Sequence, residues 1–143
     1  MTINGTLAQN TVNTLSAETG FSDIDFVVAY ENEIKPTPLT KPIAALSVKS
    51  CEIGDKITKT LDTGEIVVTN SRKMNTVLSI DIYLPYSMGG SEGHKIFDRL
   101  ATYFLFTSSY TVTQIICGDA DYDKDCQAII VRTKFTFSNS VNS

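Results

Sequence analysis

Apolar and polar residues alternate along several parts of the chain, which is the pattern of β-strands with one buried face. The clearest alternation lies in the sequence MNTVLSIDIYLP, from residue 74 to residue 85. Its alternating apolar positions are Leu78, Ile80, Ile82 and Leu84. We therefore predict a strand here with one face in the core.

Four other stretches have strand character, either alternating or rich in β-branched residues. They are SDIDFVVAY (22–30), IAALSVKSCEIG (43–54), SYTVTQIICG (109–118) and CQAIIVRTKFTFS (126–138). We expect Gly54 to end the second of them. Between that strand and the strand at 74–85, the polar segment 55–73 has turn residues in Asp-Thr-Gly, which predicts a hairpin that protrudes as an arm.

Two segments instead repeat apolar residues at helical spacing. The stronger is residues 91–106, with Ser91 as a candidate N-cap, and its apolar positions are Ile96, Phe97, Leu100, Tyr103 and Phe104. We expect Ile96, Leu100 and Phe104 to be buried against the sheet. The second segment is a short N-terminal helix over residues 6–18.

The predicted order of helices and strands indicates an α+β fold. It consists of a mostly antiparallel sheet, with one main helix and an N-terminal helix packed on one face, plus the protruding β-hairpin arm. A length of 143 residues favours a single domain, residues 1–143. The prolines of NEIKPTPLTKP exclude a helix or a central strand there, so we expect that connector to be extended and exposed.

Composition narrows the classes of function. The net charge is −4, with 12 basic and 16 acidic residues, and the basic residues are scattered, so the sequence indicates no nucleic-acid partner. The N-terminus lacks a signal-peptide pattern, and no apolar run has the length of a membrane helix, so we expect production in a cytoplasm and no membrane partner. The simplest interpretation of the three cysteines is reduced thiols, although Cys117 and Cys126 flank a turn and are the pair placed for a disulfide.

The glycine-rich segment GGSEGHK invites comparison with a phosphate-binding loop. Its glycines at 89, 90 and 93 fit neither G-x-x-x-x-G-K-[ST] nor G-x-G-x-x-G, and Glu92 places a negative charge where a phosphate would sit. We expect a sharp chain reversal before the helix. His94, the only histidine, has no acid or nucleophile near it in the sequence, so no catalytic residue is predicted.

The segment GDADYDKDC places aspartates at every second position from 119 to 125, which resembles the start of a calcium-binding loop. The sixth position is Lys124 instead of Gly, and the twelfth is Ile130 instead of Glu. We therefore interpret it as a solvated hairpin turn and predict no metal site, no cofactor and no enzymatic activity. A small calcium-binding or ligand-binding domain stays as an alternative hypothesis.

The order of segments over roughly residues 20–138 resembles one family. The similar stretches are KPTPLTKPIAALSVKSCEIG and a strand ending in DIYLPY that passes through GGSEG into HKIFDRLATYFLF. In these stretches the chain is similar to the tail terminator (tail completion) proteins of phage tails and phage-tail-like bacteriocins. The resemblance implies a virion structural protein that forms a homohexameric ring on the head-proximal end of the tail tube and ends its polymerisation.

The resemblance also implies partners, which are further copies of the chain, tail-tube proteins and, in contractile tails, sheath proteins. The candidate interface lies on the proline segment and the arm, at Lys35, Pro36, Pro38, Lys56, Lys59, Arg72 and Lys73. The basic side chains of the arm could meet acidic tube or sheath surfaces. An alternative role in the same machine is a baseplate or sheath-initiating protein.

Overall fold

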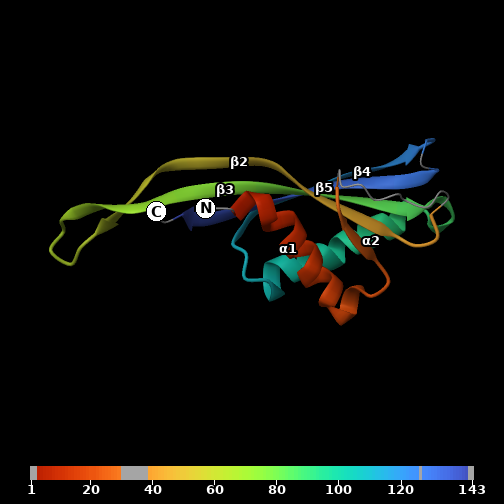
Figure 1. Ribbon diagram of the computed structural model, residues 1–143, viewed down its shortest axis with the longest axis horizontal. Helices are drawn as coiled ribbons and strands as arrows, with labels where there is room; N and C mark the ends of the chain where they lie inside the picture. Colours follow the sequence, from red (N-terminus) through yellow and green to blue (C-terminus); the bar gives the residue numbers. More distant parts are fainter. Residues whose placement is uncertain (1–2, 30–38, 126, 142–143) are drawn as a thin grey trace.

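A computed structural model describes residues 3–29, 39–125 and 127–141 of the protein. In these residues the fold is α+β, as predicted, with two α-helices and a mixed five-stranded sheet (Figure 1). The helices are α1 (Ile3–Ala17) and α2 (Gly90–Thr102). The strands are β1 (Asp25–Val28), β2 (Ile43–Thr60), β3 (Ile66–Pro85), β4 (Val112–Asp123) and β5 (Ala128–Val141).

The strands lie in the order β1-β2-β3-β5-β4. β1 runs parallel to β2, whereas β2–β3, β3–β5 and β4–β5 are antiparallel pairs. Both helices lie over the same face of this sheet (Figure 1). The alternation read from residues 74–85 is therefore the inner face of β3, the central strand.

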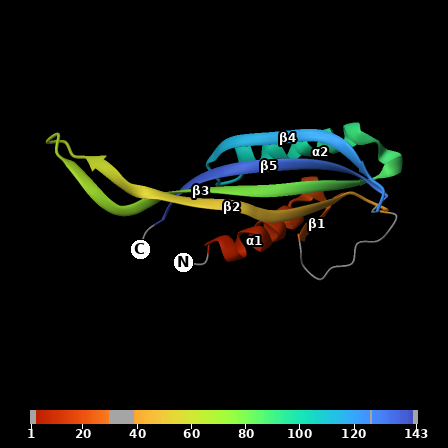
Figure 2. The ribbon, with the colours of Figure 1, turned by 90° about the horizontal axis from the view of Figure 1, so that it is seen from above.

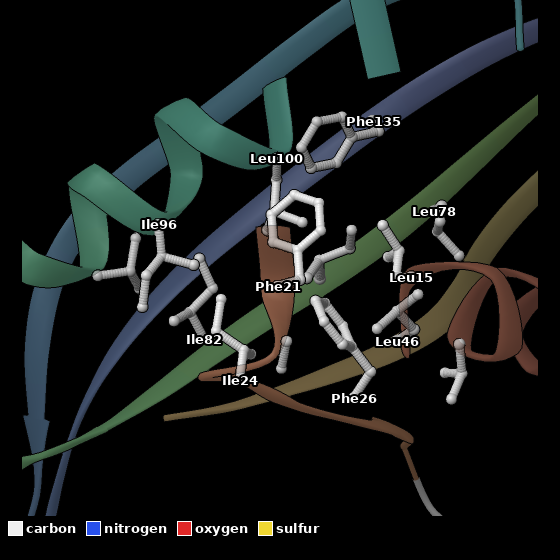
Figure 3. Packing of buried hydrophobic residues seen from close by; sticks show 14 of the residues in the cluster. Leu15, Phe21, Ile24, Phe26, Leu46, Leu78, Ile82, Ile96, Leu100 and Phe135 are labelled. Atoms are coloured by element: carbon white, nitrogen blue, oxygen red, sulfur yellow. The ribbon is translucent and has the colours of Figure 1, made fainter. Parts of the chain in front are cut away.

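The main core forms where α1, α2 and the segment after α1 meet this face of the sheet. Figure 3 shows their side chains converging on one cluster, with Leu15, Phe21 and Leu100 directed toward residues of the strands. Ile96, Leu100 and Phe104, predicted to be buried, are 3%, 0% and 0% exposed. Apolar burial of this kind is the main stabilising term of the fold.

The strands β2 and β3 are longer than predicted, because Gly54 does not end β2. Gly54 lies inside β2 at a register irregularity between Ile53 and Lys56, and pairing resumes beyond it. The chain reverses between Leu61 and Glu65, where the Leu61 N–H donates to the Glu65 carbonyl oxygen over 2.8 Å. A glycine next to a bulge bends a strand without stopping its ladder, which is why the sequence signal was misread.

The acidic segment is also strand where a turn was predicted. β4 continues to Asp123, and its pairing with β5 resumes after a register shift between Cys117 and Ala120. β4 ends at Asp123 and β5 begins at Ala128, so the chain reverses between these two residues. The turn chemistry comes from the Asp125 N–H, which donates to Asp123 Oδ1 over 2.9 Å, and from Gln127, whose φ is 49°.

The glycines before α2 have two separate roles. Gly89, with φ of 80°, precedes the first helical residue, so the N-cap position is Gly89 and the predicted cap at Ser91 is wrong. Gly93 is buried where α2 crosses the sheet. A Cβ at Gly93 would lie 2.5 Å from Val131 Cγ2 and 2.8 Å from Leu84 Cδ1, so the absence of a side chain allows the close approach of helix and strands.

Helix α2 ends earlier than predicted. Its α-helical part stops at Thr102, and a π-helical turn, Tyr103–Thr107, follows. The wider turn keeps Phe104 in the core while Phe106 is 81% exposed. The prediction of one helix over residues 91–106 required a constant period of 3.6 residues per turn. The π-helical turn interrupts that period.

An ion pair connects α2 to the segment after α1. Arg99 Nη2 lies 2.8 Å from Asp23 Oδ1, and Arg99 also donates to the Gly20 carbonyl oxygen. Its guanidinium lies over the Phe21 ring, 5.3 Å from the centroid. The hydrogen bond from Arg99 holds the pKa of Asp23 below its ordinary value of 3.8.

We predict that Gly93→Ala destabilises the fold by about 1–3 kcal/mol, because the added methyl overlaps Val131 and Leu84. The measurement is urea unfolding followed by circular dichroism. Gly5→Ala in α1 is the matched control, since a Cβ there meets nothing within 4 Å. Equal stabilities of the two variants would contradict the close approach at Gly93.

Replacing Leu100 with Ala should lower the free energy of unfolding by about 2–5 kcal/mol, since the side chain is fully buried. Leu105→Ala is the control, because Leu105 is 51% exposed and its truncation should change stability by less than about 0.5 kcal/mol. A small effect at Leu100 would place this helix face in solvent.

Asp23→Asn should lower stability near neutral pH by less than about 1 kcal/mol, because the pair with Arg99 is largely exposed. Since the pKa of Asp23 is lowered by folding, its contribution is present above 3.8 and is lost as pH falls through the lowered pKa. The difference between wild type and variant should therefore vanish in acid. Urea unfolding across that pH range, with Asp62→Asn as control, tests this, and a difference that persists in acid would refute it.

Candidate interaction surface

The part of the β2–β3 pair from residue 53 to residue 73, here called the distal hairpin, extends beyond both helices (Figure 2). Register shifts between Ile53 and Lys56 and between Lys56 and Thr58 interrupt its ladder. Such bulges bend a strand pair and increase its twist. None of the residues in the main core cluster comes from this segment.

Apolar side chains are exposed on the distal hairpin. Their exposed fractions are 44% at Ile53, 38% at Leu61, 68% at Ile66, 40% at Val67 and 62% at Val68. Nearly half of the large exposed apolar residues in the described part of the chain thus fall on this one short segment. The sequence predicted a polar hairpin arm over residues 55–73 and did not predict this exposed apolar surface. The available signal was three consecutive apolar residues in an otherwise polar arm, where a half-buried strand would alternate.

Four predicted interface residues lie on the distal hairpin: Lys56, Lys59, Arg72 and Lys73. Lys56 is the cross-strand partner of Arg72, so two like charges face each other on neighbouring strands, an arrangement that weakens a sheet. Arg72 donates from Nη1 to the Gly54 carbonyl oxygen over 3.1 Å. In the described part of the chain, none of the four forms a salt bridge.

A hollow of about 400 Å³ lies beside the bend of the hairpin. It brings together Lys56 and Lys73 with the acidic Glu52 and Asp55, and Asn75 completes its polar rim. Lys59 lies nearer the turn, opposite Val67. The hollow mixes both charges, so it does not present the convergent donors that a single anionic ligand would need.

The predicted interface residues Lys35, Pro36 and Pro38 lie outside the described residues. The same is true of Cys126, which flanks a turn with Cys117 and for which reduced thiols were the simplest interpretation. Cys51 and Cys117 carry free thiols. The arrangement of residues 30–38 therefore stays a prediction. The described end of the proline connector is not exposed as predicted, because Leu39 is 7% exposed and packs with Ile43 and Ala128.

Candidate catalytic groups are dispersed. His94 is exposed, and its Nε2 lies 3.1 Å from the Gly118 carbonyl oxygen, so its hydrogen-bond partner is a backbone group. Burial, with the nearby carboxylates Asp98 and Asp119, raises the pKa of the Cys117 thiol, which disfavours the nucleophilic thiolate. Neither group has the base–nucleophile arrangement of covalent catalysis.

The end of the molecule opposite the distal hairpin is acidic. Asp119 and Asp121 lie on β4, and Asp121 Oδ2 accepts from Arg132 Nη1 over 3.1 Å. Throughout residues 3–29, 39–125 and 127–141, no three His, Cys, Asp or Glu side chains are grouped to hold a metal ion.

Two aromatic residues are exposed at this acidic end. Tyr86, which follows β3, and Tyr122 on β4 make an edge-to-face contact with ring centroids 5.0 Å apart. They are 66% and 53% exposed, and Met88 beside them is 41% exposed. Among the described residues, exposed apolar side chains thus lie on the distal hairpin and at the acidic end, and further ones lie elsewhere at Leu105, Phe106 and Ile116.

The chain matches no known family model, and no curated protein has a similar sequence. Within its described residues, no helix has the length and apolar character needed to cross a membrane.

Replacing residues 54–73 with Asn-Gly should leave the rest of the protein folded. Ile53 and Met74 are register partners, so a two-residue turn can join them, and Asn-Gly favours the required turn type. Because no main-core residue is removed, we expect cooperative thermal unfolding and unchanged helical circular dichroism. A shortened chain that unfolds without cooperativity would show that the distal hairpin is part of the folding unit.

Proposed function

We propose that the protein is a structural subunit of a phage tail or phage-tail-like particle. In this role copies form a ring, a homohexamer by family resemblance, that caps the head-proximal end of the tail tube and ends its polymerisation. The distal hairpin is the protruding arm by which one subunit reaches another component. The role is one of binding, without catalysis, cofactor or nucleic acid.

One observation carries the proposal: the distal hairpin exposes five large apolar side chains on a segment outside the core. Exposed apolar surface on a soluble chain commonly marks a protein–protein interface, and an exposed strand pair offers backbone groups as well as side chains. A subunit of an assembly needs such a segment, whereas an isolated small-molecule-binding domain does not. The segment order shared with tail terminators supplies the particular assembly.

The basic residues of the arm favour a partner whose surface is acidic. Lys56, Lys59 and Arg72 lack a salt-bridge partner among the described residues, so an acidic surface, on a neighbouring subunit or on the tube or sheath, would complement their charge. Such contacts steer association and fix orientation more than they raise affinity. Charge reversal at these positions therefore tests the arm separately from the core.

Light scattering of the purified protein, with negative-stain imaging of the same fractions, should give a mass of several subunits and ring-shaped particles. Rings added to purified tail tubes should then be found at one end of each tube. Ile66→Thr with Val68→Thr, which keeps β-branched residues on exposed positions, should leave thermal stability nearly unchanged and lower the assembled fraction. Binding along the whole tube, or at the baseplate end, would contradict a terminating role.

A further inference from the structure

The two ends of the long axis differ in charge: the distal hairpin has four basic and three acidic residues, a net charge of +1, whereas residues 118–125 have a net charge of −3. The paired strands of the distal hairpin, residues 56–60 and 66–73, contain four basic residues and no acidic one. Asp62 and Glu65 lie at its turn, and Glu52 and Asp55 at its base. At the other end, residues 118–125 contain four aspartates and one lysine. This second surface, with Tyr86 and Tyr122, is here called the acidic end.

The sheet register keeps these two surfaces apart within one chain. Thr60 pairs with Ile66 at the turn of the distal hairpin, whereas Pro85 pairs with Ala128 beside the acidic end. The intervening strand β3 is 20 residues long, which is roughly 65 Å of extended chain. A basic side chain of the distal hairpin therefore cannot reach the acidic end of its own chain.

Both surfaces also combine charge with exposed apolar groups. Ile66, Val67 and Val68 flank the basic positions, and the Tyr86–Tyr122 pair with Met88 flanks the aspartates. A specific protein interface usually has apolar groups at its centre and a polar rim, with charges on one partner that are opposite in sign to those on the other. Each surface therefore presents what the other lacks.

We propose that the distal hairpin of one chain docks on the acidic end of a second copy, with Lys56, Lys59 and Lys73 facing Asp119 and its neighbours. The contact joins two different surfaces of identical chains, so it is heterologous and propagates head to tail until a ring closes. This inference rests on the proposed function and deepens it, because it assigns the contact between adjacent subunits of the ring.

Two charge-reversed variants test the contact. The first variant carries Lys56→Glu, Lys59→Glu and Lys73→Glu, and the second carries Asp119→Lys, Asp121→Lys and Asp125→Lys. In a solution of either variant alone, like charges face each other at every contact between chains. The constant for association of the chains should therefore fall by more than about tenfold relative to wild type. When the two variants are mixed in equal amounts, the acidic hairpin of the first variant can dock on the basic end of the second. The basic hairpin of the second variant can likewise dock on the acidic end of the first, so assemblies that alternate the two variants should form.

The readouts are sedimentation velocity and native mass spectrometry. Equal numbers of the two variants in the recovered assembly is the expected result, and Lys49→Glu on the exposed part of β2 is the control that should assemble as wild type. Because Asp121 also pairs with Arg132, thermal unfolding must show that the second variant is folded. Failure of the two folded variants to assemble when mixed overturns the proposal.

Carbodiimide cross-linking gives an independent measurement on the wild-type chain. Since the two surfaces lie at opposite ends, a bond between Lys56 or Lys59 and Asp119 must join separate chains. Recovery of that linkage supports the contact, and a wild-type protein that stays monomeric at its highest soluble concentration overturns it. Rings that form without the linkage overturn this inference alone, whereas linked rings that ignore tail-tube ends overturn the proposed tail role alone.

Discussion

The close approach of α2 to the sheet at Gly93 is the constraint on which the rest of the structure depends. Without a side chain at this position, Val131 and Leu84 contact the helix backbone directly, which draws Ile96, Leu100 and Phe104 into the core. α1 covers the neighbouring part of the same face (Figure 1). Arg99 then joins α2 to the segment between α1 and β1.

This arrangement concentrates burial on one part of the sheet and leaves the rest exposed. The two helices cover the part of β2 and β3 that lies near β1 and β5, so the same strands carry both core and surface along their length. In β3, the stretch from Met74 to Pro85 supplies the core, and the stretch before it forms the distal hairpin. The distal hairpin therefore extends far beyond the core of this small protein.

The long sheet places charged residues, as well as exposed apolar residues, at two distant ends of the molecule. The distal hairpin has a net charge of +1, from four basic and three acidic residues, and residues 118–125 at the opposite end have a net charge of −3, in a chain whose total net charge is −4. The net charge of the chain does not reveal this separation, because the positive and negative charges at the two ends cancel in the sum. Charge separation along one axis favours contacts between different surfaces over contacts between equal ones.

Local pattern alone determined much of this protein. Alternation at Leu78–Leu84 and helical spacing at Ile96, Leu100 and Phe104 predicted elements and buried faces, because each reflects contact with one core. Tertiary structure decided what local pattern cannot encode: β2 continues past Gly54, β4 includes the aspartates, and Gly93 serves packing in addition to the turn. These depend on partners distant in sequence. The proximity of Lys56 to Arg72 and of Tyr86 to Tyr122 likewise follows from strand register, which long-range pairing sets.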